Sequence, residues 1–226
     1  MKPVRVVISG SRGRMGQTLA KCLPTEPGME LVGGVDLGDD LASVLPAADV
    51  LIEFALPEAT LPNARLCAQH RKAMVIGTTG HTAAQRDQIR AAIAELPVVW
   101  TGNFSTGVNT LFWLTRRVAE IVGRDWNVEI VETHHTAKKD APSGTARQLQ
   151  AIVAAVRGAE PPAHALRIGD VVGDHTVTFG TVGERLELTH RANSREIFAR
   201  GALRAARWVV QQPPGLYDMQ DVLGLK

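Results

Sequence analysis

The first hundred residues alternate short apolar runs with amphipathic runs, and this alternation constrains the fold more than any other feature of the sequence. The apolar runs are VRVVIS, MELVGGVD, DVLIEFA, AMVIGTT and VVWTGN, and amphipathic runs lie between them near residues 14–23, 58–70 and 83–96. Strands that alternate with helices favour a parallel sheet that helices cover on both faces. We therefore predict a doubly wound α/β domain over this part of the chain.

The pattern changes after residue 103. TGVNTLFWLTRRVAEIVG predicts one long helix, WNVEIVETHH a strand, residues 143–157 a second helix, and HTVTFGTVGERLELTHRA an antiparallel hairpin that turns near Gly183. A last helix, at about 194–212, ends at a Pro-Pro-Gly sequence. We predict that residues 1–105 and 195–226 form one domain, with the C-terminal segment packed back on it. Residues 106–194 then form a smaller, mixed α+β domain.

Composition excludes several classes of protein. The formal net charge of the 226 residues is +2 and the basic residues are scattered among acidic ones, which does not indicate nucleic-acid binding. Cys22 and Cys67 each lie in an apolar helical pattern, so buried thiols are favoured over a disulfide. The N-terminal apolar run, of roughly six residues, is shorter than a secretion signal, and no run approaches the roughly 20 residues of a membrane span. We expect a cytoplasmic protein with no membrane or nucleic-acid partner.

Three glycines lie between the first predicted strand and the first predicted helix. Gly10, Gly13 and Gly16 follow the spacing Gly-x-x-Gly-x-x-Gly. Glycines here let the backbone approach a pyrophosphate, whose charge meets the amides of the helix N-terminus. Asp36, about 20 residues further on at the end of the second strand, is placed to bind the adenosine ribose hydroxyls. We predict a dinucleotide site on a Rossmann-like sheet, and the alternative is a tight turn without a ligand.

Charge near the glycine turn bears on the choice of cofactor. Asp36 favours NADH and no arginine directly follows it, whereas Arg12 and Arg14 can neutralise the extra phosphate of NADPH, so we expect both cofactors to bind. Loops after the third, fourth and fifth strands belong to the same crevice in an open α/β sheet. They contain Phe54 and Ala55, Gly77, Thr78, Thr79 and Gly80, and Thr101, Gly102, Asn103 and Phe104. Taken singly, each of these loops is typical of an ordinary connection.

The stretch ETHHTAKKDAPSGTA, residues 132–146, concentrates ionisable side chains. If WNVEIVETHH is a strand, His134 and His135 point to opposite faces, so we expect no shared metal ion. Acid–base chemistry is the better interpretation, because histidine exchanges protons near neutral pH. Lys138, in the loop after the strand, can supply a positive charge and a proton.

A helix start follows directly. Ser143, Gly144 and Thr145 offer hydroxyls and backbone amides at a helix N-terminus, which can hold a substrate carboxylate. The alternative is that Asp140 and Ser143 only cap the helix. Capping alone does not account for the histidines and lysine just upstream, so we favour a binding site.

Taken together, these motifs resemble the dihydrodipicolinate reductases, also called 4-hydroxy-tetrahydrodipicolinate reductases, of diaminopimelate and lysine biosynthesis. The resemblance covers nearly the whole chain, through VISGSRGRMG, EFALPE, GTTG, NFSTGVN, ETHHTAKKDAPSGT, GDHTVTF, GERLELTHRANSREIFARGALRAA and GLYDMQDVL. It implies an NAD(P)H-dependent reduction of 4-hydroxy-tetrahydrodipicolinate, a dicarboxylate, to tetrahydrodipicolinate. It also implies a homotetramer built through the sheet of the second domain.

The resemblance also implies a role for each matching residue. His134 would be the active-site acid or base and Lys138 the proton donor, while His135, Gly144 and Thr145 would hold the substrate's carboxylates. The residues implied to hold NAD(P)H are Gly10, Ser11, Arg12, Gly13, Arg14, Met15, Asp36, Gly77, Thr78, Thr79, Thr101, Gly102, Asn103 and Phe104. Departures from the family pattern at Thr136, Ala137 and Lys139 lie outside these roles. Because the two sets of residues lie in different predicted domains, we expect domain closure.

Two other functions fit part of the pattern. A semialdehyde dehydrogenase on the same kind of fold needs a cysteine nucleophile, but Cys22 and Cys67 lie in predicted helices far from the histidine pair. A regulator that senses NADH without turnover would account for the glycine turn. It would not account for His134, His135 and Lys138.

Overall fold

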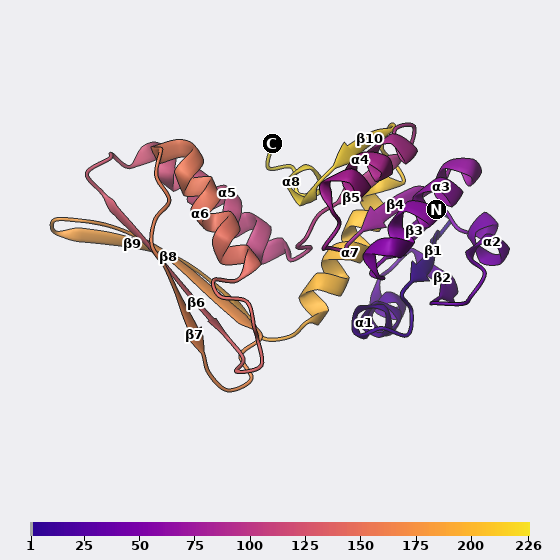
Figure 1. Cartoon of the computed structure of the whole chain (residues 1–226), viewed down its shortest axis with the longest axis horizontal. Coiled ribbons are helices and arrows are strands. Elements are labelled where there is room, and N and C mark those ends of the chain that lie inside the picture. The colour runs from indigo at the N-terminus through magenta and orange to yellow at the C-terminus, as the bar shows by residue number, and fades with distance from the viewer. Residues whose placement is uncertain (1) are drawn as a thin grey trace. The chain divides into compact units, whose positions relative to one another are not determined.

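The computed structural model describes residues 2–226, which divide into two compact units. Unit 1 comprises the chain up to Ser105 together with Glu196–Lys226, and unit 2 comprises Thr106–Arg195. Figure 1 labels the elements of both units. The second boundary lies one residue beyond the predicted one. Within the described residues, no helix has the length and apolar character needed to cross a membrane.

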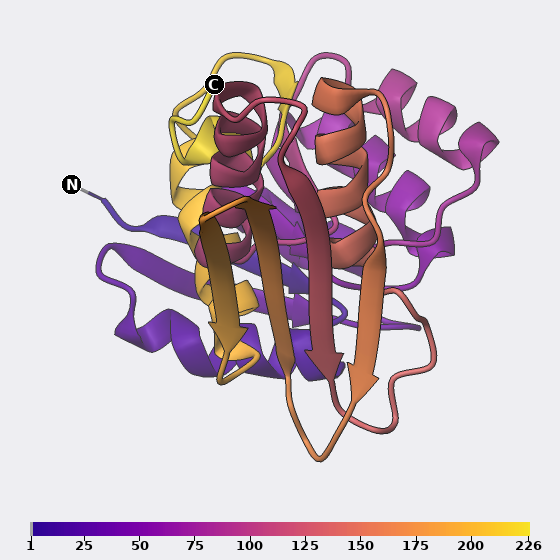
Figure 2. The same cartoon turned by 90° about the vertical axis from the view of Figure 1, so that its left-hand side faces the viewer.

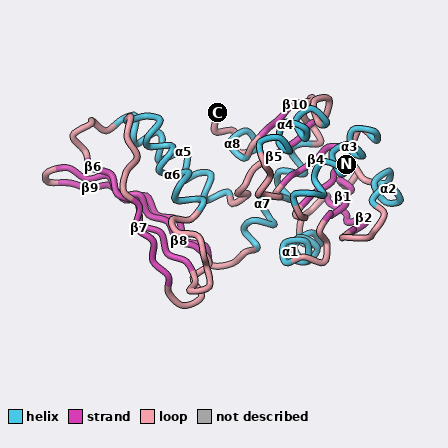
Figure 3. The backbone as a smooth tube through the Cα atoms, in the orientation of Figure 1, coloured by secondary structure: helices cyan, strands magenta, loops and turns pink. Residues whose placement is uncertain are grey.

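Unit 1 is built on a six-stranded parallel sheet in the order β10-β5-β4-β3-β1-β2. The strands are β1 (Val4–Ser9), β2 (Met29–Val35), β3 (Val50–Glu53), β4 (Ala73–Ile76), β5 (Pro97–Trp100) and β10 (Gly215–Tyr217). The helices are α1 (Arg14–Cys22), α2 (Leu41–Val44), α3 (Pro57–His70), α4 (Ala83–Ala92), α7 (Glu196–Val209) and α8 (Met219–Val222). Strand and helix alternate along the chain (Figure 3), which confirms the predicted doubly wound sheet.

Successive side chains of the central strands enter two separate hydrophobic clusters. Val6 and Ile8 of β1 pack in one cluster with residues of α1 and α7, whereas Val7 packs in the other with residues of α3 and α4. Helices α1 and α7 contact each other, and so do α3 and α4. Parallel strands covered on both faces need apolar side chains on both, which explains the continuous apolar runs of the sequence.

The C-terminal segment completes unit 1. Helix α7 buries a set of small residues on the side of the sheet that holds the cluster of Val6 and Ile8. They are Ala199, Gly201, Ala202, Ala205 and Ala206. Gly201 lies so close to the Phe104 carbonyl that a Cβ there would be 1.8 Å from its oxygen. Strand β10 then pairs with β5, where the sequence predicted only a packed tail. The sheet therefore includes nearly the last residues of the chain.

Unit 2 pairs a four-stranded sheet, in the order β7-β6-β8-β9, with two helices. Its elements are α5 (Thr106–Ile121), β6 (Asn127–His134), α6 (Gly144–Arg157), β7 (Ala163–Arg167), β8 (Gly173–Thr181) and β9 (Glu184–Ala192). Strand β6 is parallel to β7 and antiparallel to β8. The β8–β9 hairpin turns at Gly183, whose φ of 91° suits glycine. Both helices lie against the same face of the sheet (Figure 2). The predicted mixed α+β character of this part of the chain is thus confirmed.

The inward face of β6 changes character along its length. Val128 and Ile130 are buried against Phe179 and Val177 of β8, and these four belong to the hydrophobic core of the unit. The next inward positions are Glu132 and His134, which are also buried. The face that the helices cover is thus apolar at one end and polar at the other. A polar end inside a packed face requires partners for each group.

Candidate active site

Glu132 and His134 occupy successive inward positions at the end of β6. The Nδ1 of His134 lies 2.5 Å from the Oε2 of Glu132. A carboxylate only accepts hydrogen bonds, so Nδ1 carries the proton and Nε2 is left as the nitrogen that can exchange one. Gly173 lies opposite, and a Cβ there would be 2.9 Å from Nε2. The glycine therefore keeps that nitrogen unobstructed.

Glu132 is fully buried and carries a full set of donors. Arg167 of β7 donates to both carboxylate oxygens, at 2.8 and 2.9 Å, and the Ser143 backbone N–H donates at 3.0 Å. Burial opposes the ionisation of Glu132, but the hydrogen bonds from Arg167 and His134 outweigh it, so the pKa of this carboxyl lies below its usual value. Glu132 is therefore a charged group within the core.

Ser143 caps helix α6 from a buried position. Its Oγ accepts from the Ala146 backbone N–H at 3.2 Å and lies 3.1 Å from the Nε2 of His175. The Ser143 hydroxyl is therefore used inside the unit, in the capping role that the sequence analysis gave as the alternative. Desolvation lowers the pKa of His175 to about 4, which keeps this histidine neutral.

Lys138 and His135 lie in the loop that joins β6 to α6. The Nζ of Lys138 is 2.8 Å from the Oδ1 of Asp140, and the Lys138 side chain is 22% exposed. The Lys138 backbone N–H donates to the His135 carbonyl, which fixes the turn. Gly144, at the helix start, is exposed and has open space where a Cβ would be. Unit 2 thus brings His134, Lys138 and the N-terminus of α6 to one end of its sheet.

The glycines of the unit 1 turn lie at close backbone contacts. A Cβ on Gly10 would be 2.2 Å from the Phe54 carbonyl oxygen, and one on Gly16 would be 2.2 Å from the Gly10 oxygen. Gly13 is the N-cap of α1, no side chain caps this helix, and its first turn holds no acid. The helix N-terminus is therefore suited to an anion, as the dinucleotide prediction requires.

Asp36 follows β2 and is tied to the glycine turn. Its carboxylate accepts from the backbone N–H groups of Leu37 and Arg12, both at 2.8 Å, and these bonds lower its pKa. The Arg12 guanidinium pairs with Asp39 at 3.0 Å and donates to the Leu37 carbonyl. Arg12 of the glycine turn therefore lies beside Asp36, after which the sequence has no arginine.

The loops after β3, β4 and β5 interlock. The Phe54 ring lies over Gly77, where a Cβ would be 2.2 Å from it, and contacts Phe104 with 5.6 Å between ring centroids. Thr78 accepts from the Ala55 N–H through its hydroxyl. Phe104 is only 1% exposed, and its carbonyl oxygen lies against Gly201 of α7.

A pocket of about 320 Å³ opens beside these loops. Its lining includes four predicted cofactor residues, Thr78, Thr79, Thr101 and Gly102, together with Gly80, His81, Arg86, Arg90, Trp100 and Leu216. The predicted residues of the fourth and fifth strands are thus gathered at one edge of the sheet. Gly10 to Met15 and Asp36 form a second group, around the glycine turn.

Comparisons with known proteins agree on one family along the whole chain. The family model for the N-terminus of dihydrodipicolinate reductase matches residues 4–104, and the model for its C-terminus matches residues 107–223. The chain belongs to the dihydrodipicolinate reductase family. Its activity is the NAD(P)H-dependent reduction of 4-hydroxy-tetrahydrodipicolinate in diaminopimelate and lysine biosynthesis.

Relatives and a solved structure agree with this assignment. The 4-hydroxy-tetrahydrodipicolinate reductase of Syntrophus aciditrophicus is 42% identical over 99% of both chains, and that of Anaeromyxobacter sp. is 44% identical over 99% of this chain and 98% of its own. The dipicolinate-bound dihydrodipicolinate reductase of Paenisporosarcina sp. superimposes with a TM-score of 0.84 at 26% identity, over 97% of this chain and 98% of that one. Family membership and fold therefore rest on independent comparisons.

The cysteines of this dihydrodipicolinate reductase family member do not suit the competing dehydrogenase chemistry. Cys22 and Cys67 are buried in α1 and α3 of unit 1. Burial raises the pKa of Cys67 to about 12, and that of Cys22 also lies above its usual value. A nucleophilic cysteine needs a lowered pKa and access to substrate, and neither thiol has both.

Three residues at the polar end of unit 2 had no role in the sequence analysis. Glu132 and His175 stood inside quoted motifs, and their burial at inward strand positions is the signal that marks them. Arg167 lies on β7, a strand that the sequence did not predict. Its contact with Glu132 spans 35 positions of sequence, which no local pattern shows.

Proposed function

We propose that the polar end of unit 2 performs the proton chemistry of the reductase reaction, with His134 and Lys138 as the catalytic residues. The observation that carries this proposal is the buried, charged Glu132 at 2.5 Å from His134 Nδ1, with Lys138 in the adjoining loop. NAD(P)H, when bound, supplies the hydride, which the family reaction delivers to ring C4 of the substrate. The protein must then stabilise the charge that moves into the imine and carboxylate system and deliver a proton.

His134 exchanges its proton at Nε2. Glu132 fixes the tautomer and orientation of the ring through Nδ1, and it stabilises the imidazolium when Nε2 is protonated. Lys138 supplies a cation in the loop before α6 and a proton from Nζ. Asp140 holds that ammonium at 2.8 Å and lowers the number of conformations it can adopt.

The substrate's carboxylates are proposed to bind at the start of α6. The amides of Gly144 and Thr145 lie at a helix N-terminus, which favours an anion, and His135 adds a side chain from the same loop. The dipicolinate-bound relative supports a pyridine dicarboxylate as the ligand class. Ser143 serves this site by holding the helix start.

Both NADH and NADPH are proposed to bind unit 1. Asp36 accepts hydrogen bonds and suits the ribose hydroxyls, whereas Arg12 lies beside it and can exchange Asp39 for the 2′-phosphate of NADPH. Substitution Arg12→Met should raise the KM for NADPH about tenfold and leave that for NADH nearly unchanged. An equal rise for both cofactors would contradict this role.

We also propose a homotetramer that forms through the face of the unit 2 sheet opposite to α5 and α6. That face carries Val131 and Leu166, which are exposed. Light scattering on the purified protein tests this proposal. A monomer at assay concentration would contradict it.

The test of the proposed function is the fall in NADH or NADPH absorbance when the protein meets the substrate, generated in situ from pyruvate and aspartate semialdehyde by its synthase. Oxidation that pyridine-2,6-dicarboxylate inhibits is expected. His134→Ala and Lys138→Ala should each lower kcat by about 10²- to 10⁴-fold with NADH binding retained, because a positioned proton donor contributes that much. Tight NADH binding without oxidation would favour the sensor instead.

A further inference from the structure

Arg167 connects the two proposed catalytic side chains. It ends β7, in register with His134 of the parallel strand β6. Its guanidinium donates to both oxygens of Glu132, to the carbonyls of Lys138 and Asp140, and to its own neighbour Leu166. An arginine has five N–H donors. All of them are therefore used within this one site.

The first group of contacts controls His134. Two parallel N–H···O bonds, at 2.8 and 2.9 Å, hold the Glu132 carboxylate in one plane. That carboxylate in turn holds His134 Nδ1. Because Glu132 is fully buried, its charge persists only while Arg167 compensates it.

The second group of contacts controls Lys138. Arg167 Nε donates to the Lys138 carbonyl at 3.3 Å and Nη2 donates to the Asp140 carbonyl at 2.6 Å. These carbonyls flank the segment that carries both Lys138 and the carboxylate that holds its Nζ. The loop therefore takes its conformation from the same guanidinium that orients Glu132.

We propose that Arg167 is a positioning residue that sets His134 and Lys138 together in their reactive arrangement. This inference rests on the proposed function of the two residues and adds that one guanidinium couples them. A lysine cannot replace it, because an ammonium is a point charge that cannot bind a carboxylate in a fork and also reach two carbonyls in the same plane.

The experiment compares Arg167→Lys, Arg167→Met and Arg167→Ala with the matched control Arg185→Met. Arg185 is an exposed arginine of β9 in the same sheet, and its Nε pairs with Glu187 at 3.1 Å. Both Arg167→Lys and Arg167→Met should lower kcat by about 100-fold, because misplaced catalytic groups cost that much, while the KM for NADH stays within about twofold. The control should keep wild-type kcat.

Two measurements separate positioning from a merely structural role. The profile of kcat/KM against pH should move by about one unit in Arg167→Met, because the compensating charge beside Glu132 is gone. Added guanidinium, below denaturing concentration, should restore kcat of Arg167→Ala by about tenfold, because it can refill the vacated donor positions. Should Arg167→Met fail to fold, Arg167→Lys, which keeps the charge, carries the test.

The inference is overturned if Arg167→Lys keeps kcat near the wild-type value. It is also overturned if the loss of kcat only follows the loss of folded protein, with an unchanged pH profile and no rescue. A wild-type protein that does not oxidise NADH with substrate overturns the proposed function and this inference with it. An active wild type with unaffected Arg167 variants overturns the inference alone.

Discussion

Two buried carboxyl groups, Glu53 at the end of β3 in unit 1 and Glu132 on β6 in unit 2, ionise in opposite ways. Neither side chain is exposed. Desolvation raises the pKa of Glu53 to about 7, whereas the pKa of Glu132 lies below its usual value although desolvation acts against it too. Burial has the same sign for both carboxyls, so the difference lies in their partners.

The partners differ in charge and number. Glu132 accepts from a guanidinium, a backbone N–H and an imidazole. Glu53 accepts from the Thr60 hydroxyl at 2.8 Å, and its Oε2 has no hydrogen-bond partner among the described residues. Thr60 is also bonded to His81, at 2.8 Å. The hydrogen-bond donors around a buried acid therefore decide whether it ionises. Only the donors around Glu132 are sufficient to stabilise a carboxylate charge.

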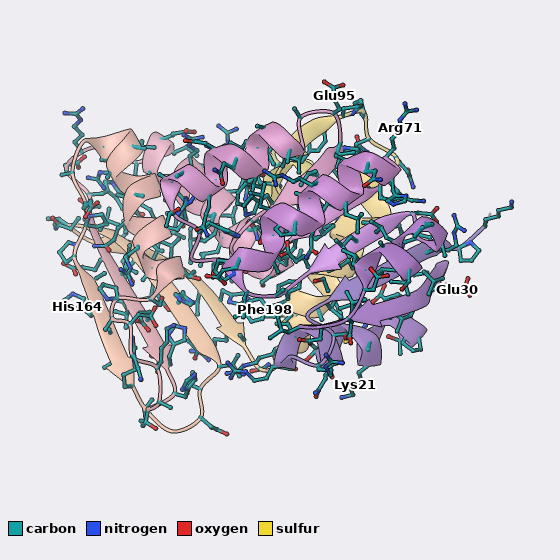
Figure 4. The ribbon with its side chains drawn as sticks, turned by 45° about the vertical axis from the view of Figure 1, so that its right-hand side comes forward. Lys21, Glu30, Arg71, Glu95, His164 and Phe198 are labelled. Carbon is teal, nitrogen blue, oxygen red and sulfur yellow. The ribbon has the colours of Figure 1, made fainter. Side chains whose placement is uncertain are left out.

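The largest expected effect is that of Glu132→Gln. The substitution leaves Arg167 with no carboxylate and should lower the free energy of unfolding by about 3–5 kcal/mol, the cost of breaking a buried pair. Urea denaturation measures it. The matched control is Glu129→Gln on the same strand, whose partner His164 lies on the edge strand β7 (Figure 4) at 2.7 Å. This exposed pair should contribute less than about 1 kcal/mol, and equal losses would contradict the comparison.

Glu53→Gln should have the opposite sign. An unfolded Glu ionises near its ordinary pKa of 4.5 and the folded one near 7, so wild-type stability falls as the pH rises through this window. Gln mimics the neutral acid and cannot ionise. At pH 8 the variant should be more stable than the wild type by about 2 kcal/mol, and at pH 4.5 the two should be nearly equal. A variant that is less stable than the wild type at pH 8 would contradict a raised pKa of Glu53 in the folded protein.

Acidification should therefore affect the two units differently. His175, with a folded pKa of about 4 below its ordinary 6.5, contributes stability that is present above pH 6.5 and is lost as the pH falls towards 4. Between pH 7 and pH 5, strand β8 should lose about 1–2 kcal/mol of protection while β3 gains protection from Glu53. Hydrogen exchange resolved by segment, corrected for the intrinsic rate, measures this. A change of the same sign in both strands would contradict this prediction.

The smallest effect concerns activity alone. Gly173→Ala places a Cβ 2.9 Å from His134 Nε2 and should lower kcat about tenfold, because that nitrogen must shift. Gly180→Ala, on the same strand, is the control, since its Cβ would meet only the Arg185 Cβ at 3.8 Å. Steady-state kinetics on both variants suffices. Equal kcat values would show that the space beside Nε2 is not needed.

The sequence predicted those parts of the molecule whose signals are local. Alternating runs and Gly10 to Gly16 indicated the parallel sheet and its turn, and Gly183 marked the hairpin. The short elements α2, β7, β10 and α8 were missed, because three to five residues carry little periodicity. The roles assigned to His134, Lys138 and the cofactor residues stay predictions until the variants are measured.

The sequence could not show contacts that depend on the register of strand pairing. Glu132 is an acid at an inward position among apolar ones, and its charge is intelligible only with Arg167 placed beside it by the β6–β7 pairing. A serine at position 143 could bind a ligand or cap a helix. Only its buried hydrogen bonds to Ala146 and His175 distinguish these two roles. The sequence motif identifies these residues, but the pairing of strands distant in sequence decides their chemistry.

The return of the C-terminal segment to unit 1 has a consequence for biosynthesis on the ribosome. Residues up to Ser105 emerge first, but the face of their sheet that α7 covers must wait for Glu196–Val209, and the edge next to β5 must wait for β10. Unit 2 is one uninterrupted segment and has all its strands before α7 is made. The part of the chain synthesised first is therefore the part that finishes folding last, and its apolar surface needs protection during translation.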